Sequence, residues 1–250
     1  MDFKKIGRLL LMVSVMGLAA SCTLDEPKDL EDAEPASGRV KEITMMGLIK
    51  AVSVKYDNQN RVTKVSAPSF DVTFEINYKG NEITSMTGDD EDGRIEMTDV
   101  RLNSKGYIES FLSFEQGDPE PIKQTFSYDS EGHLTRISYS DGGSLNYTWE
   151  NGLLTAVDEY DSMDPSHTAH VRYTYGDIEN IHCQWSPFWY GTLGFYNLTG
   201  LFGKGPSKFI ISATEDYETE RYDYKLNKYG YISAERSLVD GETITLTYRY

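Results

Sequence analysis

The stretch Y-D-S-E-G-H-L-T-R-I, residues 128–137, decides the fold of this chain. It begins with an aromatic anchor, passes through a polar turn that contains glycine, and ends with two apolar residues three positions apart. Asp, Ser and Gly favour turns because they bond to their own backbone or tolerate a positive φ. Strand-forming residues on both sides of such a turn predict a β-hairpin with a loop of three to five residues.

The same pattern returns seven times along the 250 residues. Successive anchors lie about 21 to 26 residues apart, except for one final interval of about two periods. A period of this size is typical of an architecture built from stacked supersecondary units. The seven copies occupy residues 56–65, 78–86, 102–111, 128–137, 149–157, 175–181 and 226–235.

The residues before each anchor predict the first strand of each hairpin. Val52, Val54 and Tyr56 alternate with polar residues, which is the period of a half-buried strand. The two apolar residues after the turn are three positions apart and do not fit strict alternation. A β-bulge near the start of the return strand would bring both to one face.

Seven hairpins require at least fourteen strands, and no long stretch has the apolar period of an α-helix. An open sheet of that length must curl to bury one face. We therefore predict an all-β fold: a long, curled antiparallel meander of about seven hairpin repeats.

The repeat resembles the YD repeats of RHS-type proteins, most closely in residues 128–137, and a family of uncharacterised Bacteroidetes lipoproteins built from such repeats. The resemblance covers roughly residues 45–250 and implies a fold rather than an activity. It also implies a partly helical insert that ends in a G-K-x-S-K-like run, similar to residues 203–208 here.

The N-terminus reads as an export signal. Basic residues precede an apolar run that is too short to anchor in a bilayer, and small residues stand directly before Cys22. This resembles a lipoprotein box, so we expect residues 1–21 to be a signal peptide and Cys22 to be acylated. An ordinary signal peptide is the alternative. Residues 22–40 are acidic and contain no aromatic side chain, which predicts a disordered tether before a single domain over 41–250.

These features indicate a location and limit the partners. Early acidic residues after Cys22 resemble an export signal to the outer face of the outer membrane, with the periplasmic face as the alternative. Without residues 1–21 the chain has 21 basic and 39 acidic side chains, a net charge of −18. Such a surface repels phosphate backbones, so we expect no nucleic-acid partner. Membrane lipid through Cys22, and a glycan or an envelope protein, are the expected partners.

The repeat lapses over about residues 184–210, where aromatic residues, glycines and prolines gather. One interpretation is an aromatic platform for sugars. The other is a hydrophobic plug that covers one face of the curled sheet, which we favour because a one-sided sheet needs a cover. The candidate ligand-binding residues of the platform are Trp185, Trp189, Tyr190, Gln184 and Asn197.

No catalytic motif is evident, and we expect no catalytic residue, no metal and no cofactor. The acidic run 89–93 lacks the spacing of an EF-hand loop, and His167 and His170 lack a third ligand. Cys183 is the only other cysteine, and we interpret it as a structural residue.

The sequence favours a non-enzymatic, lipid-anchored envelope protein whose sheet presents a binding surface. A glycan-active hydrolase that uses a carboxylate pair near the aromatic insert is one alternative. A structural or adhesion component of the cell surface is another.

Overall fold

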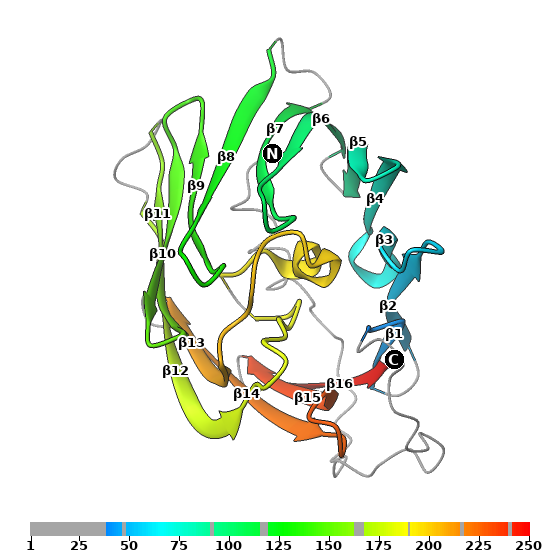
Figure 1. Cartoon of the computed structure of the whole chain (residues 1–250). Coiled ribbons are helices and arrows are strands. Elements are labelled where there is room, and N and C mark those ends of the chain that lie inside the picture. The colour runs from blue at the N-terminus through cyan, green and yellow to red at the C-terminus, as the bar shows by residue number, and fades with distance from the viewer. Residues whose placement is uncertain are drawn as a thin grey trace.

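Sixteen antiparallel strands form one closed barrel in the computed structural model (Figure 1). The structure describes residues 39–250 except 47–48, 91–92, 116–119, 163–167, 190, 216–217 and 240–241. The expected signal peptide, Cys22 and most of the tether therefore lie outside the described residues.

Each strand pairs with its neighbours in the chain, and the first strand pairs with the last. The strands are β1 Glu42–Met45, β2 Ile49–Tyr56, β3 Val62–Ala67, β4 Val72–Lys79, β5 Glu82–Asp90, β6 Gly93–Leu102, β7 Ile108–Glu115, β8 Ile122–Tyr128, β9 Leu134–Tyr139, β10 Ser144–Glu150, β11 Leu153–Tyr160, β12 His170–Glu179, β13 Lys208–Glu215, β14 Glu218–Leu226, β15 Ile232–Val239 and β16 Glu242–Arg249.

The all-β class is right, but the predicted open meander is wrong. Glu42 to Met45 of β1 pair with Arg249 to Leu246 of β16, so the sheet has no free edge. Sixteen twisted strands bring the two ends of the sheet together, and closure pairs backbone groups that an open edge would leave exposed.

The repeat builds the hairpin turns. In the fourth copy, Asp129 Oδ1 accepts hydrogen bonds from the backbone N–H groups of Glu131, Gly132 and His133 at 2.7–2.9 Å. Gly132 has φ 100° and thus takes the left-handed conformation that the turn requires. Asp57, Asn103 and Asn227 accept the equivalent bonds in the other long turns.

The predicted bulge is confirmed, and it explains the threonine in L-T-R-I. Tyr128 pairs with Leu134 while Ser127 pairs with Arg136, so Thr135 is the extra residue of the return strand. Its hydroxyl donates to Ser127 O at 3.1 Å, a carbonyl beside the register shift. Hydroxyls at the same position of the first, second, fifth and seventh copies make the same bond.

Aromatic side chains fasten neighbouring strands at the end of the barrel where these turns lie. Each donates from an even-numbered strand, or from the residue directly after it, to a carbonyl near or just before the start of the preceding odd-numbered strand. We call these six hydrogen bonds, at 2.6–2.9 Å, the rim bonds. They join Tyr56 to Val40, Tyr128 to Ile108, Trp149 to Leu134, Tyr175 to Leu154, Tyr224 to Ile210 and Tyr250 to Ile232.

The lumen of the barrel is its hydrophobic core. Inward side chains such as Ile43, Met86 and Ile137 are fully buried. Burial of this apolar surface stabilises the fold by about 25 cal/mol per Å². The core is completed by residues 180–207, the connection between β12 and β13, which runs inside the ring of strands (yellow in Figure 1). We call this connection the plug.

The plug corrects the expectation of a partly helical insert that covers a face. Its helical content is a single 3-10 helix, η2 Gly194–Thr199, and a second such helix, η1 Pro68–Phe70, is the remaining helix of the described chain. The segment enters the lumen because the sheet is closed and encloses its apolar face. Trp189 is 0% exposed, and Phe195 and Phe202 are also buried.

Close backbone contacts hold the plug to the rim. Ile108 N–H donates to Leu201 O at 2.8 Å, and Lys204 N–H donates to Gly132 O at 3.0 Å. A side chain at Gly203 would place its Cβ 2.6 Å from Gly132 O, so glycine is required where the plug passes the rim.

Candidate functional site: a cavity at the turn end of the barrel

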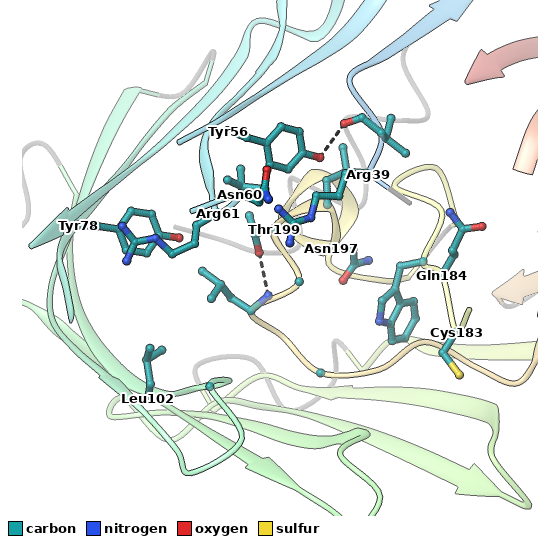
Figure 2. Close-up of a pocket in the computed structure, with 18 of the residues that line it drawn as sticks. Arg39, Tyr56, Asn60, Arg61, Tyr78, Leu102, Cys183, Gln184, Asn197 and Thr199 are labelled. Carbon is teal, nitrogen blue, oxygen red and sulfur yellow. Dashed lines mark hydrogen bonds between the residues drawn. The ribbon is translucent and has the colours of Figure 1, made fainter. Parts of the chain in front are cut away.

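A cavity of about 530 Å³ opens at the end of the barrel where the repeat turns lie (Figure 2). Its wall comes from the first three copies of the repeat and its floor from the plug. Figure 2 shows Tyr78 and Leu102 on one side and Gln184 and Cys183 on the other, with Arg39 between them. This volume lies within the range of small-molecule sites, about 300–1,000 Å³.

The cavity lies where the rim bonds are interrupted. Leu102 occupies the anchor position of the third copy and has no hydroxyl to donate. Tyr78 is the anchor of the second copy, and within the described chain it makes no rim bond to β3. Its ring instead carries the guanidinium of Arg61, whose Cζ lies 4.0 Å from the ring centroid. Strands β3 to β6 therefore lack the fastening found around the rest of the rim.

Arg61 is held by several partners. Its Nε and Nη2 donate to Asp57 Oδ2 at 2.8 and 2.7 Å, and Nη1 donates to Gly80 O at 2.5 Å. The hydrogen bonds from Arg61 lower the pKa of Asp57 against the opposing effect of desolvation. Arg61 thus joins the turns of the first two copies and has little donor capacity left for a ligand.

Arg39 differs in having unused capacity. Its guanidinium lies 5.6 Å from the centroid of the Tyr56 ring. Burial raises the pKa of Tyr56 to about 12, partly offset by the charge of Arg39. Arg39 Nη1 is shielded from solvent and finds no hydrogen-bond partner in the described part of the chain. An unpaired buried donor costs about 1–3 kcal/mol, more when it is charged.

The indole of Trp185 provides a second unused donor at the cavity. Its Nε1 is also shielded and unpaired within the described ranges. The ring is half-buried and packs edge-on against Trp149 and Trp189, with centroid distances of 6.1 and 6.0 Å. This packing fixes the plane of the ring at the cavity floor.

The cavity lining is electropositive although the protein is acidic. Among the residues that the structure describes, the lining contains Arg39 and Arg61 but no aspartate or glutamate. At the average frequency of acidic residues in the sequence, about three would be expected among these nineteen. A pocket of one sign concentrates ligands of the opposite sign.

The structure divides the candidate residues that the sequence singled out. Gln184, Trp185 and Asn197 line the cavity. Trp189 is a core residue whose Nε1 donates to Tyr224 Oη at 2.6 Å, so its ring does not face a ligand. Tyr190 lies outside the described residues. The plug interpretation thus describes Trp189, and the platform interpretation retains only the residues at the outer surface of the plug.

Gln184 has a structural role as well. Its Nε2 donates to Tyr250 Oη at 3.0 Å and its Oε1 accepts from Ile232 N–H at 3.2 Å. Asn197 is buried, and its Nδ2 donates to Thr192 Oγ1 at 3.3 Å. These bonds orient the amides of Gln184 and Asn197 at the floor of the cavity.

A buried carboxylate joins the plug to the barrel. Glu235 on β15 is 0% exposed, and its Oε2 accepts from Ser186 Oγ at 2.6 Å and Tyr248 Oη at 2.5 Å. Burial raises the pKa of Glu235 to about 7, and the two hydrogen bonds only partly offset that effect. The charge of Glu220 raises it further. Both glutamates lie near the insert, but neither lines the cavity.

Sequence reasoning missed the two arginines. Arg39 stands at the junction of the expected tether and the first strand, and Arg61 ends a turn, so neither belongs to a recognisable motif. The one available signal was the change of charge, because Arg39 follows a stretch, residues 22–38, that has six acidic residues and one basic residue.

No group of three or more potential metal ligands occurs in the ranges that the structure describes. His170 Nδ1 lies 2.9 Å from Asp158 Oδ1, in an ion-pair cluster with Arg172, and His167 is outside the described residues. Cys183 is a free thiol that lines the cavity.

The outer wall of the barrel is polar. Exposed and buried residues alternate along the strands, and the exposed ones include Arg94 and Glu96 on β6 and Lys123 and Thr125 on β8. Cross-strand ion pairs cover the same surface, with Lys64 Nζ 2.6 Å from Glu75 Oε1 and Arg236 bound to Asp223. This is the reverse of a membrane-spanning barrel, whose strands turn apolar residues outward and polar residues inward.

No helix in the described part of the chain is both long and apolar enough to cross a membrane.

Comparison with known proteins identifies the fold through solved structures. No protein-family model and no curated protein matches the chain. A porin-like protein from Bacteroides uniformis has a TM-score of 0.57 at 20% identity, over 79% of this chain and 88% of that one. A porin-like protein from Bacteroides vulgatus has a TM-score of 0.50 at 13% identity, over 85% of this chain and 98% of that one.

These likenesses correct the family resemblance drawn from the repeat. The similar structures are porin-like proteins, and the chain itself is a closed sixteen-strand barrel, whereas the YD and RHS resemblance implied a curled meander of repeats. The hairpin motif is local and is compatible with both forms, so it could not distinguish them. At this level of identity the likeness shows the fold alone.

Proposed function

We propose that this protein is a non-enzymatic binding protein of the outer membrane, attached through acylated Cys22. Its barrel stands in water and binds a glycan at the cavity between the rim and the plug, which we call the rim cavity. The single observation that carries the proposal is the polarity of the barrel, with charged residues outside and an apolar, plugged lumen inside.

The location draws on two independent features. The lipobox-like sequence before Cys22 supports attachment by lipid, and the porin-like solved structures support an outer-membrane setting. The barrel wall itself does not suit a bilayer, because charged side chains such as Arg94 and Lys123 would face the lipid at a cost of about 2–4 kcal/mol each near the midplane. We therefore assign the membrane contact to the lipid, and we favour the outer face.

A pore is disfavoured by the plug. Trp189 is fully buried inside the barrel, and Phe188 and Phe195 of the same plug are buried and pack edge-on against each other with a centroid distance of 5.7 Å. These side chains occupy the space through which ions would pass. The porin-like name of the similar structures thus supports the shape and the location rather than conduction.

A glycan suits the cavity better than the other expected partners. Aromatic rings of Tyr56, Tyr78 and Trp185 are at the lining, together with amides of Asn60 and Asn197. Sugars bind in this way, with apolar ring faces against aromatic side chains and hydroxyl groups on amides. The hydrolase alternative lacks a carboxylate pair at this cavity.

Two experiments test the proposal. A lipid-bilayer recording of the purified protein should show no conductance, and cell fractionation should find the protein in the outer membrane until Cys22→Ser releases it. A glycan array should give binding that Trp185→Ala weakens. Steady single-channel conductance, or an outer-membrane location unaffected by Cys22→Ser, would contradict the assignment of membrane contact to the lipid. Absence of binding to every glycan would contradict the proposed ligand.

A further inference from the structure

We infer that the rim cavity recognises a sugar carboxylate, so that the glycan is an acidic polysaccharide such as a polyuronate, with Arg39 as the group that binds the carboxylate. The inference rests on the proposed glycan function and specifies its ligand.

Arg39 offers a donor that the described chain leaves unused. Its Nη1 has no hydrogen-bond partner, and Arg39 makes no ion pair among the described residues. A charged donor that is shielded from water and unpaired is satisfied best by an anionic acceptor, and the planar guanidinium matches the two oxygens of a carboxylate.

The surroundings of Arg39 also favour an anion. The described part of the lining has no aspartate or glutamate to compete for Arg39 or to repel an anion. Arg61 adds a second positive charge, though Asp57 engages it. The strongly acidic remainder of the surface would repel an acidic polymer, so a positive cavity directs binding to this one site.

The size and the lining of the cavity suit a sugar better than a small anion. About 530 Å³ is far more than a single inorganic anion needs. Aromatic faces at Tyr56 and Trp185, and a second unpaired donor at Trp185 Nε1, suit the ring and a hydroxyl group of a sugar. A carboxylate carried on a pyranose ring offers an acceptor of the right charge for Arg39, and hydroxyl groups for Trp185, in a space that is large enough for the ring.

The test is a titration of the full chain with oligogalacturonate, in which every ring carries a carboxylate, and with its methyl ester, in which the charge is removed. The acid should bind at least ten-fold more tightly than the ester. Arg39→Gln should remove about ten- to a hundred-fold of the affinity for the acid and leave the ester unaffected, because a charge-assisted hydrogen bond is lost. Trp185→Phe keeps a ring but removes the donor, and should weaken both ligands several-fold.

Two controls make the result interpretable. Arg101→Gln removes an exposed arginine of β6 that does not line the cavity, so it should leave both affinities unchanged. The free thiol of Cys183 lines the cavity, and its rate of labelling by a maleimide should fall when the acid is bound. An unchanged melting temperature of Arg39→Gln would show that loss of binding is not loss of fold.

The outcomes separate this inference from the proposed function. Equal binding of acid and ester, or binding of the acid that survives Arg39→Gln, would overturn the carboxylate inference while glycan binding stands. Binding of neutral glycans alone would do the same. Binding of no glycan on any array would overturn both.

Discussion

The rim of the barrel has two sectors that the same repeat builds with opposite results. Around most of the rim, from β7 to the closure at β2, an aromatic side chain on each even-numbered strand, or directly after it, donates a rim bond to a backbone carbonyl at the preceding strand. From β3 to β6 these rim bonds are missing, because Leu102 has no donor and the ring of Tyr78 packs under Arg61. We call the part of the rim from β7 to β2 the fastened sector and the part from β3 to β6 the unfastened sector. The cavity lies against the unfastened sector.

The comparison separates stability from recognition. In the fastened sector the plug fills the space below the rim, and its polar groups are satisfied by the barrel, as Trp189 Nε1 is by Tyr224. At the cavity, which the unfastened sector and the plug line together, Arg39 and Trp185 keep unpaired donors. A rim built by one repeat thus opens into a binding site beside the place where the repeat omits its rim bonds.

Removal of the plug's central side chain should have the largest effect. Trp189→Ala would leave a cavity in the core and should lower the free energy of unfolding by about 3–5 kcal/mol. Trp185→Ala, on a half-buried ring at the cavity, should lower it by much less. Chemical denaturation of both variants measures the difference. Equal losses would show that the cavity floor contributes to the core as much as the buried centre of the plug does.

The buried carboxylate should give the next largest effect, and one that depends on pH. Glu235 has a pKa of about 7 in the folded state and about 4.5 when unfolded, so the folded state holds its proton more tightly. Its contribution to the free energy of unfolding therefore declines as pH rises from 4.5 to 7, by about 3 kcal/mol in total.

Glu235→Gln removes this titration. The variant should gain stability relative to the wild type above pH 7, and the gain should vanish below about pH 4.5. Carboxylates that do not interact with Glu235 titrate alike in both proteins, so the difference between the two curves isolates Glu235 together with its interaction with Glu220. A difference that is constant with pH would contradict the buried, partly neutral carboxylic acid.

A rim bond should have a smaller effect, which differs between the two sectors. Tyr128→Phe removes the part-buried 2.7 Å bond to Ile108 O and should cost about 1–2 kcal/mol. Tyr78→Phe removes a hydroxyl that makes no rim bond and should cost less than about 0.5 kcal/mol. Thermal unfolding of the two variants compares the sectors directly, and equal costs would remove the distinction between them.

The smallest effect should come from the bulge. Thr135→Val keeps the shape of the side chain but removes the hydroxyl that bonds to Ser127 O, and should cost about 0.5–1.5 kcal/mol. Thr125→Val, at an exposed position of β8 outside the bulge, is the matched control and should change the free energy of unfolding by no more than about 0.5 kcal/mol. A loss as large in the control would show that the hydroxyl at the bulge has no special role.

The sequence predicted the hairpins because their determinants are local. Asp129, Gly132 and Thr135 set the turn and the bulge within eight residues of one another. Closure was not predicted, because the pairing of β1 with β16 joins residues some two hundred positions apart and no local pattern records it. An open meander and a closed barrel have the same hairpins.

The site was predicted in part for the same reason. Aromatic composition identified the plug and three of the lining residues, Gln184, Trp185 and Asn197. It could not show that Trp189 turns into the core, because both orientations suit an aromatic side chain beside an apolar sheet. Arg39 could be recognised as a candidate only once the barrel had placed it beside the plug, at a cavity whose described lining has no carboxylate.

The most direct test of the account is hydrogen exchange of the backbone with and without saturating oligogalacturonate. Binding at the unfastened sector should slow exchange in the turns at 57–61, 80–81 and 103–107 and in the plug at 197–203, all of which carry cavity-lining residues. The turns at 129–133 and 227–231, on the fastened sector, should exchange at unchanged rates. Protection of those two turns with none at the first three would contradict the claim that the protein binds its ligand where the rim bonds are missing.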